Sequence, residues 1–404
     1  MRTMLMTAAL ALGVIIQAAH AQDGAAPVPT PPPNAPEQEP AFPQQTRAPQ
    51  QDSGVILESE TIATGLVHPW AIEFLPSGEL LVTERTGNLR VVTQDGDVSA
   101  PIAGVPEVDD RGQGGLLDVA LAPDFAANRL IYLSYSEPRG GNSNGTSVAR
   151  ARLSEDATRL EDLEVIFRQE PAWESTLHFG SRLVWDRQGR LYVTLGERSL
   201  MESRQLAQSL EGHLGKVVRI NADGSIPQSN PYVDDDSARD AIWSYGHRNI
   251  QGATLHPETG ELWTIEHGPK GGDEINIPQA GLNYGWPIIS YGEAYSGEPI
   301  GEGITAKEGM EQPLYYWDPV IAPSGMLFYQ GEMFPDWQGD LLIASLNPGA
   351  LVRLELENER VVGEERLLTD IGRLRDIAEG PNGALWAVTD QQNGKLLKLT
   401  PAES

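Results

Sequence analysis

Short apolar runs separated by turn residues recur from Val55 to the end of the chain, while stretches with a helical period are scarce. One unit is repeated: an apolar strand, a turn rich in Pro, Asp or Gly, and a second apolar strand that opens with leucine. The six copies read WAIEFLPSGELLVTE, LDVALAPDFAANRLIYLSY, RLVWDRQGRLYVTLGE, GATLHPETGELWTIEH, GMLFYQGEMFPDWQGDLLIAS and RDIAEGPNGALWAVTD, and their second strands open at Leu80, Leu130, Leu191, Leu262, Leu341 and Leu385. Such patterning predicts antiparallel hairpins.

The spacing of the copies indicates how the hairpins assemble. Neighbouring leucines lie 44 to 79 residues apart, and a four-stranded propeller blade takes about 40 to 50 residues. Because an isolated hairpin is only marginally stable, repetition around a ring is the natural way to bury each one. We therefore predict an all-β, six-bladed β-propeller of four-stranded antiparallel sheets over residues 55–404, with a β-sandwich or a parallel β-helix as the alternative.

The first 54 residues have a different character. Arg2, an apolar run over residues 8–16 and the small-x-small sequence Ala19-His20-Ala21 predict a signal peptide over residues 1–21, cleaved near Ala21. The apolar run is too short for a permanent anchor, so we expect no stable membrane insertion and a periplasmic or secreted protein. Residues 22–54 are rich in Pro, Gln and Ala, which predicts a disordered linker.

Composition excludes several classes of function. The formal net charge is −28, which would repel a nucleic-acid backbone. The chain has no cysteine, so disulfides, Cys-ligated zinc, iron–sulfur clusters and thiol nucleophiles are excluded. No P-loop, Rossmann or HExxH motif is present in the sequence.

Polar residues recur at one register of the repeat. Eight residues before the turn Pro or Asp stand His68, Gly115, His178, Asn249 and Arg373. Gln113 and Arg248 lie beside two of these positions, and Ser324 is the nearest counterpart in the fifth copy. Equivalent positions of a ring converge, so these side chains are candidates for one pocket. The alternative is a set of loop residues that solvates a rim.

The densest polar region lies between Ser244 and Tyr295. Gly268-Pro269 and Gly271-Gly272 predict an irregular loop with exposed carbonyl oxygens, and Asp273-Glu274 follows directly. Carbonyl and carboxylate oxygens are the ligands of a hard cation. An ordinary turn with two solvated acids is the alternative, because no EF-hand-like spacing is present.

Eight motifs in order resemble the soluble quinoprotein sugar dehydrogenases, the family of aldose sugar dehydrogenases and soluble glucose dehydrogenases that uses pyrroloquinoline quinone (PQQ). They read HPWAIEFLPSGELLVTER at 68–85, GQGGLLDVALAPDF at 112–125, HFGSRLVWD at 178–186, LGKVVRIN at 214–221, IWSYGHRNIQG at 242–252, EHGPKGGDEINIP at 266–278, NYGWP at 283–287 and RLRDIAEGPNG at 373–383. The resemblance covers residues from about 55 to 400 and implies a six-bladed propeller.

The resemblance also implies roles for individual residues. His178 matches the general base that takes the proton of the anomeric hydroxyl while hydride passes from sugar C1 to C5 of the quinone. Arg248 and a calcium ion would stabilise negative charge on the quinone oxygen. The other positions that match cofactor contacts are Gln113, Asn249, Tyr295, Arg373 and Arg375. Those that match calcium contacts are the carbonyls of Gly268 and Pro269, together with Glu274 and Tyr284.

Two positions depart from the family pattern. Asn347, in the loop SLNPG, stands where relatives commonly place a cofactor-binding Lys. Leu177 stands where relatives place Asp or Asn before the catalytic His, so the orientation of His178 must come from elsewhere.

Three functions compete. The leading one is PQQ- and calcium-dependent oxidation of an aldose to a lactone, with electrons passed to an external acceptor such as a quinone or a redox protein. A calcium-dependent propeller lactonase would need several carboxylate or Asn ligands on the axis, where this chain has His, Arg and Gln. A non-catalytic carbohydrate-binding propeller would explain the nine tryptophans, but not His178 together with Arg248, Arg373 and Arg375.

Overall fold

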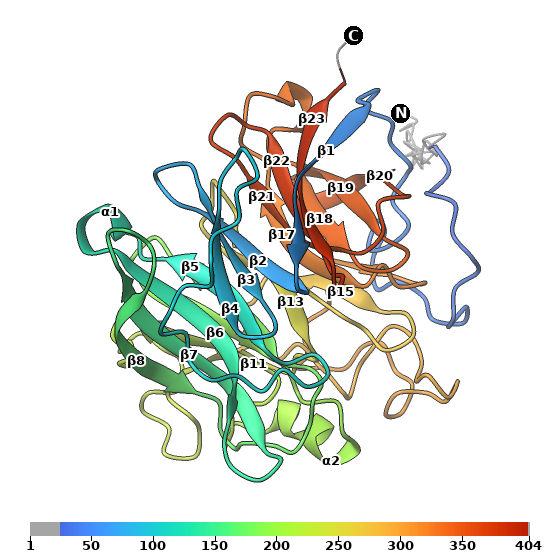
Figure 1. Cartoon of the computed structure of the whole chain (residues 1–404). Helices are drawn as coiled ribbons and strands as arrows, with labels where there is room; N and C mark the ends of the chain where they lie inside the picture. The colour runs from blue at the N-terminus through green and yellow to red at the C-terminus, as the bar shows by residue number, and fades with distance from the viewer. Residues whose placement is uncertain (1–24, 403–404) are drawn as a thin grey trace, which may run out of the picture.

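A computed structural model describes residues 25–402 of the chain, so the predicted signal peptide lies outside the described residues. Six antiparallel sheets surround one axis (Figure 1). The innermost strand of each sheet contacts the innermost strand of the next, in the closed order β2, β5, β9, β13, β17, β21 and back to β2. The predicted six-bladed β-propeller is therefore confirmed.

The blades follow one another along the chain, and the strands below are given from the axis outward. The first three blades are β2 (Pro69–Phe74), β3 (Leu80–Glu84), β4 (Asn88–Val92); β5 (Leu116–Leu121), β6 (Leu130–Pro138), β7 (Asn144–Leu153), β8 (Leu160–Arg168); and β9 (Gly180–Trp185), β10 (Arg190–Leu195), β11 (Lys216–Asn221), β12 (Ile242–Tyr245). The last three are β13 (Ile250–Leu255), β14 (Leu262–Glu266), β15 (Asp273–Asn276), β16 (Tyr315–Trp317); β17 (Pro323–Phe328), β18 (Leu341–Ser345), β19 (Ala350–Glu357), β20 (Arg360–Leu367); and β21 (Leu374–Glu379), β22 (Leu385–Thr389), β23 (Gly394–Pro401), β1 (Leu57–Leu66).

Helical structure is limited to short turns. These are α1 (Phe125–Asn128), α2 (Met201–Arg204) and two 3₁₀ turns at Gln205–Gln208 and Pro335–Trp337. Within residues 25–402, no helix has the length and apolar character needed to cross a bilayer.

Five of the six blades have four strands, and the first has three. In that blade, the irregular segment 98–102 runs along the outer edge of β4, where Ser99 N–H donates to the Val91 carbonyl (2.9 Å) and Ile102 N–H to the Leu89 carbonyl (2.8 Å). The ring is closed in the last blade, because β1 from the start of the propeller pairs with β23 from its end. Both ends of the repeat region are thus held in one sheet.

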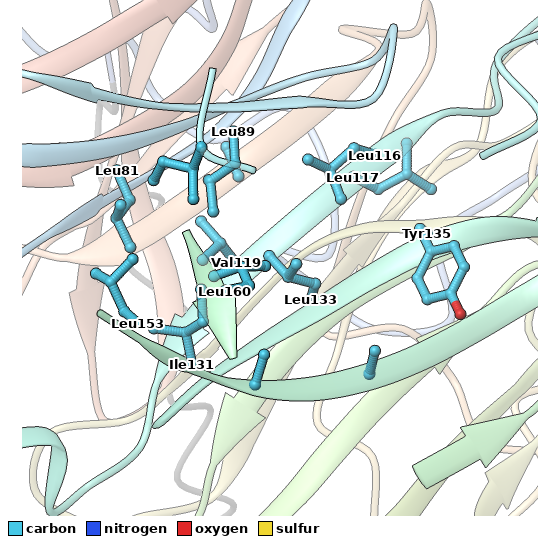
Figure 2. Close-up of a cluster of buried hydrophobic side chains, with 14 of the residues drawn as sticks. Leu81, Leu89, Leu116, Leu117, Val119, Ile131, Leu133, Tyr135, Leu153 and Leu160 are labelled. Atoms are coloured by element: carbon cyan, nitrogen blue, oxygen red, sulfur yellow. The ribbon is translucent and has the colours of Figure 1, made fainter. Parts of the chain in front are cut away.

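The core lies between neighbouring blades. Figure 2 shows the cluster between the first and second blades, where Leu81 and Leu89 meet Leu116, Val119 and Leu133. Of the six leucines that mark the repeat, five are buried and Leu130 is half-buried. The apolar runs found in the sequence therefore lie between blades, as a stacked repeat requires.

Residues 25–54 differ from the sequence-based prediction of a disordered linker. They form an extended arm that follows the outer edges of the fourth and fifth blades (Figure 1). Gln45 and Ala48 in this arm are buried, Tyr316 N–H of β16 donates to the Gln45 carbonyl (2.9 Å), and Gln51 N–H donates to the Glu364 carbonyl of β20 (2.8 Å). The prediction was wrong for these residues because the arm takes its apolar partners and its backbone hydrogen bonds from the propeller.

Candidate active site

The residues at the recurring polar register all lie where an innermost strand begins. His68, Gly115 and Arg373 directly precede β2, β5 and β21, His178 lies two residues before β9, and Asn249 directly precedes β13. Ser324 is the second residue of β17. Since the six strands start at the same end of the ring, the register places these residues around the axis at that end.

A cavity of about 120 Å³ lies on the axis between these strand starts. Among its lining residues are Gln113, Asn249, Arg373 and Arg375, which the sequence had singled out, together with Trp70, Phe179, Gln251, His267, Leu346 and Asp390. We call it the upper cavity. Three predicted cofactor positions lie outside its lining: Arg248 is buried next to Asn249, Tyr295 is 77% exposed, and Asn347 is exposed beside Leu346.

His178 lies at the edge of the upper cavity, directly before Phe179. Its backbone has φ 50°, its N–H donates to Gln113 Oε1 (2.9 Å), and its ring Nδ1 lies 2.7 Å from Glu197 Oε1. Burial and the nearby Arg248 charge lower the pKa of His178 to about 4. The ring is therefore neutral at pH 7, and the Glu197 contact favours the tautomer with the proton on Nδ1 and a basic Nε2.

Glu197, which the sequence reasoning missed, belongs to a second recurring register. An acid stands at or just after the end of the second strand in four blades: Glu84, Glu197, Glu266 and Asp390. Each contacts the residues that begin the first strand of its own blade. Glu84 accepts from Val67 N–H (2.7 Å), and Glu266 accepts from Arg248 N–H (2.5 Å) and Asn249 N–H (3.2 Å). The repeated ending VTE, LGE, TIE and VTD was the signal that could have found them.

Arg198 secures the turn that leads to His178. Its fully buried guanidinium donates to the carbonyls of Leu177 (3.0 Å) and Ser175 (2.7 Å) and to Asn144 Oδ1 (2.7 Å). It also packs on the Phe179 ring, 4.0 Å from the centroid. The orientation that Leu177 does not supply comes from Glu197 and Arg198, and neither residue precedes His178 in the sequence.

The backbone N–H groups of Arg248 and Asn249 hold both residues in place, and Asn249 Oδ1 also accepts from Gly180 N–H (3.2 Å). Both N–H groups bind Glu266, while Arg248 Nη1 donates to the His267 carbonyl (2.9 Å). Arg248 Nε is buried without a hydrogen-bond partner in residues 25–402. The guanidinium also lies 5.2 Å from the centroid of Trp286. The arrangement leaves a buried cationic donor beside His267, which lines the upper cavity.

A second cationic group, Arg375, lines the cavity itself. Arg375 is buried and donates to Asp390 Oδ2 (3.0 Å) and to Gln251 Oε1 (3.1 Å), and its Nε has no partner within the described residues. Arg373 shares Asp390 Oδ2 (2.9 Å) but is half exposed. Although burial opposes it, the charges of Arg375 and Arg373 hold the pKa of Asp390 well below its usual range. Two cations on one carboxylate leave positive charge facing the cavity.

Residues 268–273, here called the glycine loop, connect β14 to β15. Gly268 and Pro269 are buried, and neither carbonyl oxygen accepts a hydrogen bond from any residue in 25–402. Asp273 anchors the loop by accepting from the N–H groups of Gly268 (2.8 Å), Ile321 (2.8 Å) and Ala322 (2.7 Å). Burial raises the pKa of Asp273 to about 7. Two buried carbonyl oxygens are thus free to bind a cation.

A pair of carboxylates lies behind the glycine loop. Glu266 and Glu274 are cross-strand partners, and burial, with Glu266 nearby, raises the pKa of Glu274 well above its usual value. Asn276 Nδ2 donates to Glu274 (2.9 Å), whereas Asn276 Oδ1 is buried and unpartnered among the described residues. Tyr284 is buried and stacks on His247 at 4.9 Å. Within residues 25–402, no group of three or more His, Cys, Asp or Glu residues could hold a metal by itself.

The far end of the axis carries a larger cavity of about 340 Å³, here called the lower cavity. Its charged lining residues include Glu73, Asp118, Asp376 and Arg182. Arg182 pairs with Asp118 (3.1 Å) and Asp376 (2.8 Å). Burial raises the pKa of Glu73 to about 8, with Asp118 and Asp376 adding to the effect. The sequence analysis assigned nothing to this end.

Comparisons with known proteins identify the family and support the fold. A sequence model of the family described as Glucose / Sorbosone dehydrogenase matches residues 66–398. The aldose sugar dehydrogenase YliI of Escherichia coli is 46% identical over 347 residues, which is 85% of this chain and 92% of the relative. A solved glucose dehydrogenase is 50% identical with a TM-score of 0.83, over 86% of this chain and 100% of that chain. The PQQ-bound aldose sugar dehydrogenase of Streptomyces coelicolor is 27% identical with a TM-score of 0.70, over 86% and 98% of the two chains.

Proposed function

The chain belongs to the Glucose / Sorbosone dehydrogenase family and is by that membership a sugar dehydrogenase, and we propose that it oxidises aldoses at C1 to lactones with PQQ and calcium. The observation that carries the proposal is a neutral, oriented imidazole at the edge of a cavity with buried, incompletely paired arginines. His178 is the base of that arrangement and Glu197 its positioning partner.

The chain's own groups account for the proton transfer. His178 Nε2 would take the proton of the anomeric hydroxyl, because Nδ1 is already engaged by Glu197. Proton removal places positive charge on the ring, and the adjacent Glu197 carboxylate stabilises it. Gln113 holds the His178 backbone N–H, which fixes the ring at the start of β9.

The residues present fit an anionic quinone. PQQ carries three carboxylates, and guanidinium groups are the preferred partners of carboxylates in buried sites. Arg248 and Arg375 are buried and each has an unpartnered Nε, which a bound anion would satisfy; Arg373, Asn249 and Gln113 complete the polar wall. When bound, the quinone would accept the hydride from sugar C1, which completes the two-electron oxidation, and an external acceptor would reoxidise it.

A calcium ion fits the glycine loop through oxygen atoms of different kinds. The free carbonyls of Gly268 and Pro269 would face the cofactor side, while Glu274 and the backbone of Tyr284 would serve a calcium-linked position behind the loop. Carbonyl-rich coordination of this sort is ordinary for calcium. Asn347 supplies no cation where relatives commonly have Lys, so we expect the arginines to carry most of the cofactor affinity.

The two competing functions explain less of the site. A lactonase would use a calcium held by several acidic or amide side chains on the axis, whereas Arg375, Gln251 and Asn249 occupy that place. A carbohydrate-binding propeller needs no buried base, yet His178 has its tautomer selected by Glu197. For the protein as a whole we propose export to the periplasm or the outside of the cell, where a quinone or redox protein takes the electrons.

Reduction of an artificial acceptor dye tests the proposal. The purified apoprotein would be assayed with aldoses after addition of PQQ alone, calcium alone, and both together. We expect turnover only with both additions, and an absorbance titration that saturates at one quinone per chain. Quinone that fails to bind at any calcium concentration would overturn the proposal and favour the carbohydrate-binding function.

A further inference from the structure

The N-terminal arm contacts the segments that cover the glycine loop. Asp318 accepts from Asn34 N–H (2.9 Å), Asn34 Nδ2 (2.6 Å) and Ala35 N–H (2.9 Å). Gln38 binds the backbone of Gly292 in both directions, because Gly292 N–H donates to Gln38 Oε1 (2.6 Å) and Gln38 Nε2 donates to the Gly292 carbonyl (3.4 Å). The arm thus binds two segments, one at Asp318 and one at Gly292.

Those two segments enclose the glycine loop from outside. Gly272 N–H donates to the Trp317 carbonyl (2.8 Å), and Lys270 exchanges two backbone hydrogen bonds with Glu293 (2.9 Å each). A Cβ on Gly271 would lie 2.8 Å from the Asp318 carboxylate, and one on Gly292 would lie 2.6 Å from the Gly271 carbonyl carbon and oxygen. The loop therefore has no room to move outward unless the Asp318 and Gly292 segments move first.

The centre of the arm is built into the same region. Gln45 is fully buried and its amide donates to the Pro313 carbonyl (2.9 Å), while Tyr291 Oη donates to Gln45 Oε1 (3.1 Å). Tyr291 also stacks on Tyr316 of β16, with 3.8 Å between ring centroids. These contacts join the arm to the edge strand of the blade that carries the glycine loop.

We infer that residues 25–54 are a positioning element for the proposed calcium and quinone site. The arm holds the Asp318 and Gly292 segments against the glycine loop, and so fixes the carbonyls of Gly268 and Pro269 in the orientation that binds the cation. This rests on the proposed function. The family match begins at residue 66, so the arm lies outside the shared domain, and it tunes affinity without supplying a ligand.

The arm would strengthen cation binding because it preorganises the glycine loop. A loop whose carbonyls point in several directions must lose conformational freedom when it binds a cation, and that loss weakens binding. A loop already held by Trp317, Glu293 and Asp273 loses less. The arm stabilises two of these three restraints from outside, since Asp318 follows Trp317 and Gly292 precedes Glu293 in the chain.

The test uses the full-length double variant Asn34→Ala/Gln38→Ala. The matched control is Ser53→Ala, because Ser53 binds Glu365 of the next blade (2.9 and 3.1 Å) and contacts neither enclosing segment. Amide hydrogen exchange on the apoprotein measures directly how strongly the glycine loop is restrained. We expect exchange at Lys270 and Gly272 to rise about tenfold in the double variant and to remain unchanged in Ser53→Ala.

Calcium-dependent quinone binding, followed by absorbance, measures whether the loss of this restraint weakens calcium binding. We expect the calcium concentration at half-saturation to rise about 3- to 10-fold in the double variant alone. Unchanged exchange at Lys270 and Gly272 in a folded double variant would overturn the inference, and so would faster exchange with unchanged calcium dependence. If the wild-type protein binds no quinone, the proposed function fails, whereas the exchange data still decide whether the arm restrains the loop.

Discussion

The two axial cavities are both lined by charged side chains, but they differ in how those charges are satisfied. In the lower cavity, Arg182 is paired with Asp118 and Asp376, and acids outnumber cations. In the upper cavity, Arg375 and Arg373 share one carboxylate, and Arg375 Nε has no partner in residues 25–402. The upper cavity therefore offers an unpaired buried donor to an anionic ligand, whereas Arg182 in the lower cavity lies between two carboxylates that would repel one.

A short polar layer separates the cavities. The Trp70 ring lies 4.2 Å from the Arg182 guanidinium and 5.9 Å from that of Arg375. Gln251 accepts from Arg182 through its carbonyl (2.7 Å) and from Arg375 through its side chain (3.1 Å). We therefore propose the smaller cavity as the site and the larger one as structural, because unmet hydrogen-bonding capacity of buried donors indicates a ligand more directly than volume does.

The largest effect is expected when the proposed base, His178, is removed from the edge of the upper cavity. His178→Ala should lower kcat for dye reduction about 10³-fold, because His178 is the buried imidazole at this edge that a carboxylate orients, whereas the ring of His267, which also lines the cavity, is bound through Nε2 to the Pro323 carbonyl. Quinone binding by absorbance titration should be unchanged. His256→Ala, in the turn between β13 and β14, is the control and should retain full turnover. Turnover that survives in His178→Ala would show that another group takes the proton.

Glu197→Gln tests whether the recurring acid positions the base. The amide keeps a contact with Nδ1 but loses the charge that stabilises the protonated ring, so kcat should fall about 10²-fold. Because Glu197 raises the pKa of His178 against the lowering effect of burial, the acid limb of the kcat/KM profile should move to lower pH. Glu84→Gln, at the equivalent position of the first blade, is the matched control. An unmoved pH profile would mean that Glu197 serves the fold alone.

Replacing one arginine at each end separates binding from stability. Arg375→Met should weaken quinone binding about tenfold, since one cation is lost from the wall of the upper cavity. Arg182→Met should leave quinone affinity unchanged but lower the free energy of unfolding by about 3 kcal/mol, because two buried carboxylates lose their partner. Titration and denaturant unfolding of both variants measure the contrast. Equal effects on quinone affinity would contradict the distinction between the cavities.

The smallest expected effect is on the pH dependence of protein stability, through Glu73 in the lower cavity. Folded Glu73 has a pKa raised to about 8, and an unfolded Glu titrates at about 4.3. Between these values the folded state holds a proton that the unfolded state has released, so stability falls as pH rises. Glu73→Gln should therefore raise Tm relative to wild type by about 2 °C more at pH 8.5 than at pH 5. An equal difference at both pH values would show that Glu73 is ordinarily ionised.

The parts of the site that the sequence predicted follow from its repeat. Asn249 and Arg373 line the upper cavity and His178 lies at its edge because a ring brings equivalent strand starts together, and the repeat itself is visible as apolar runs separated by turn residues. Glu197 was missed because its partner lies 19 residues away, just before the neighbouring strand. Tyr295 and Asn347 lie in loops outside the cavity lining, where the repeat predicts nothing.

The N-terminal arm shows why composition alone did not predict the contacts of residues 25–54. Composition measures whether a segment can bury its own apolar surface, and residues 22–54 cannot. It does not measure whether an edge strand elsewhere will accept the segment, as β16 and β20 accept Gln45 and Gln51. A disordered linker was the expected result of a local argument applied to a segment whose contacts are almost all long-range.

The sequence by itself determined the hairpins, their number, the residues at each strand start and the family, because these depend on local periodicity and on short contiguous motifs. Only the tertiary structure decided which acid orients His178, which arginines remain incompletely paired, and that the arm binds the two segments that enclose the glycine loop. Those features depend on distances between residues far apart in the chain. Such distances are set by ring closure and by packing between blades, and no local pattern encodes them.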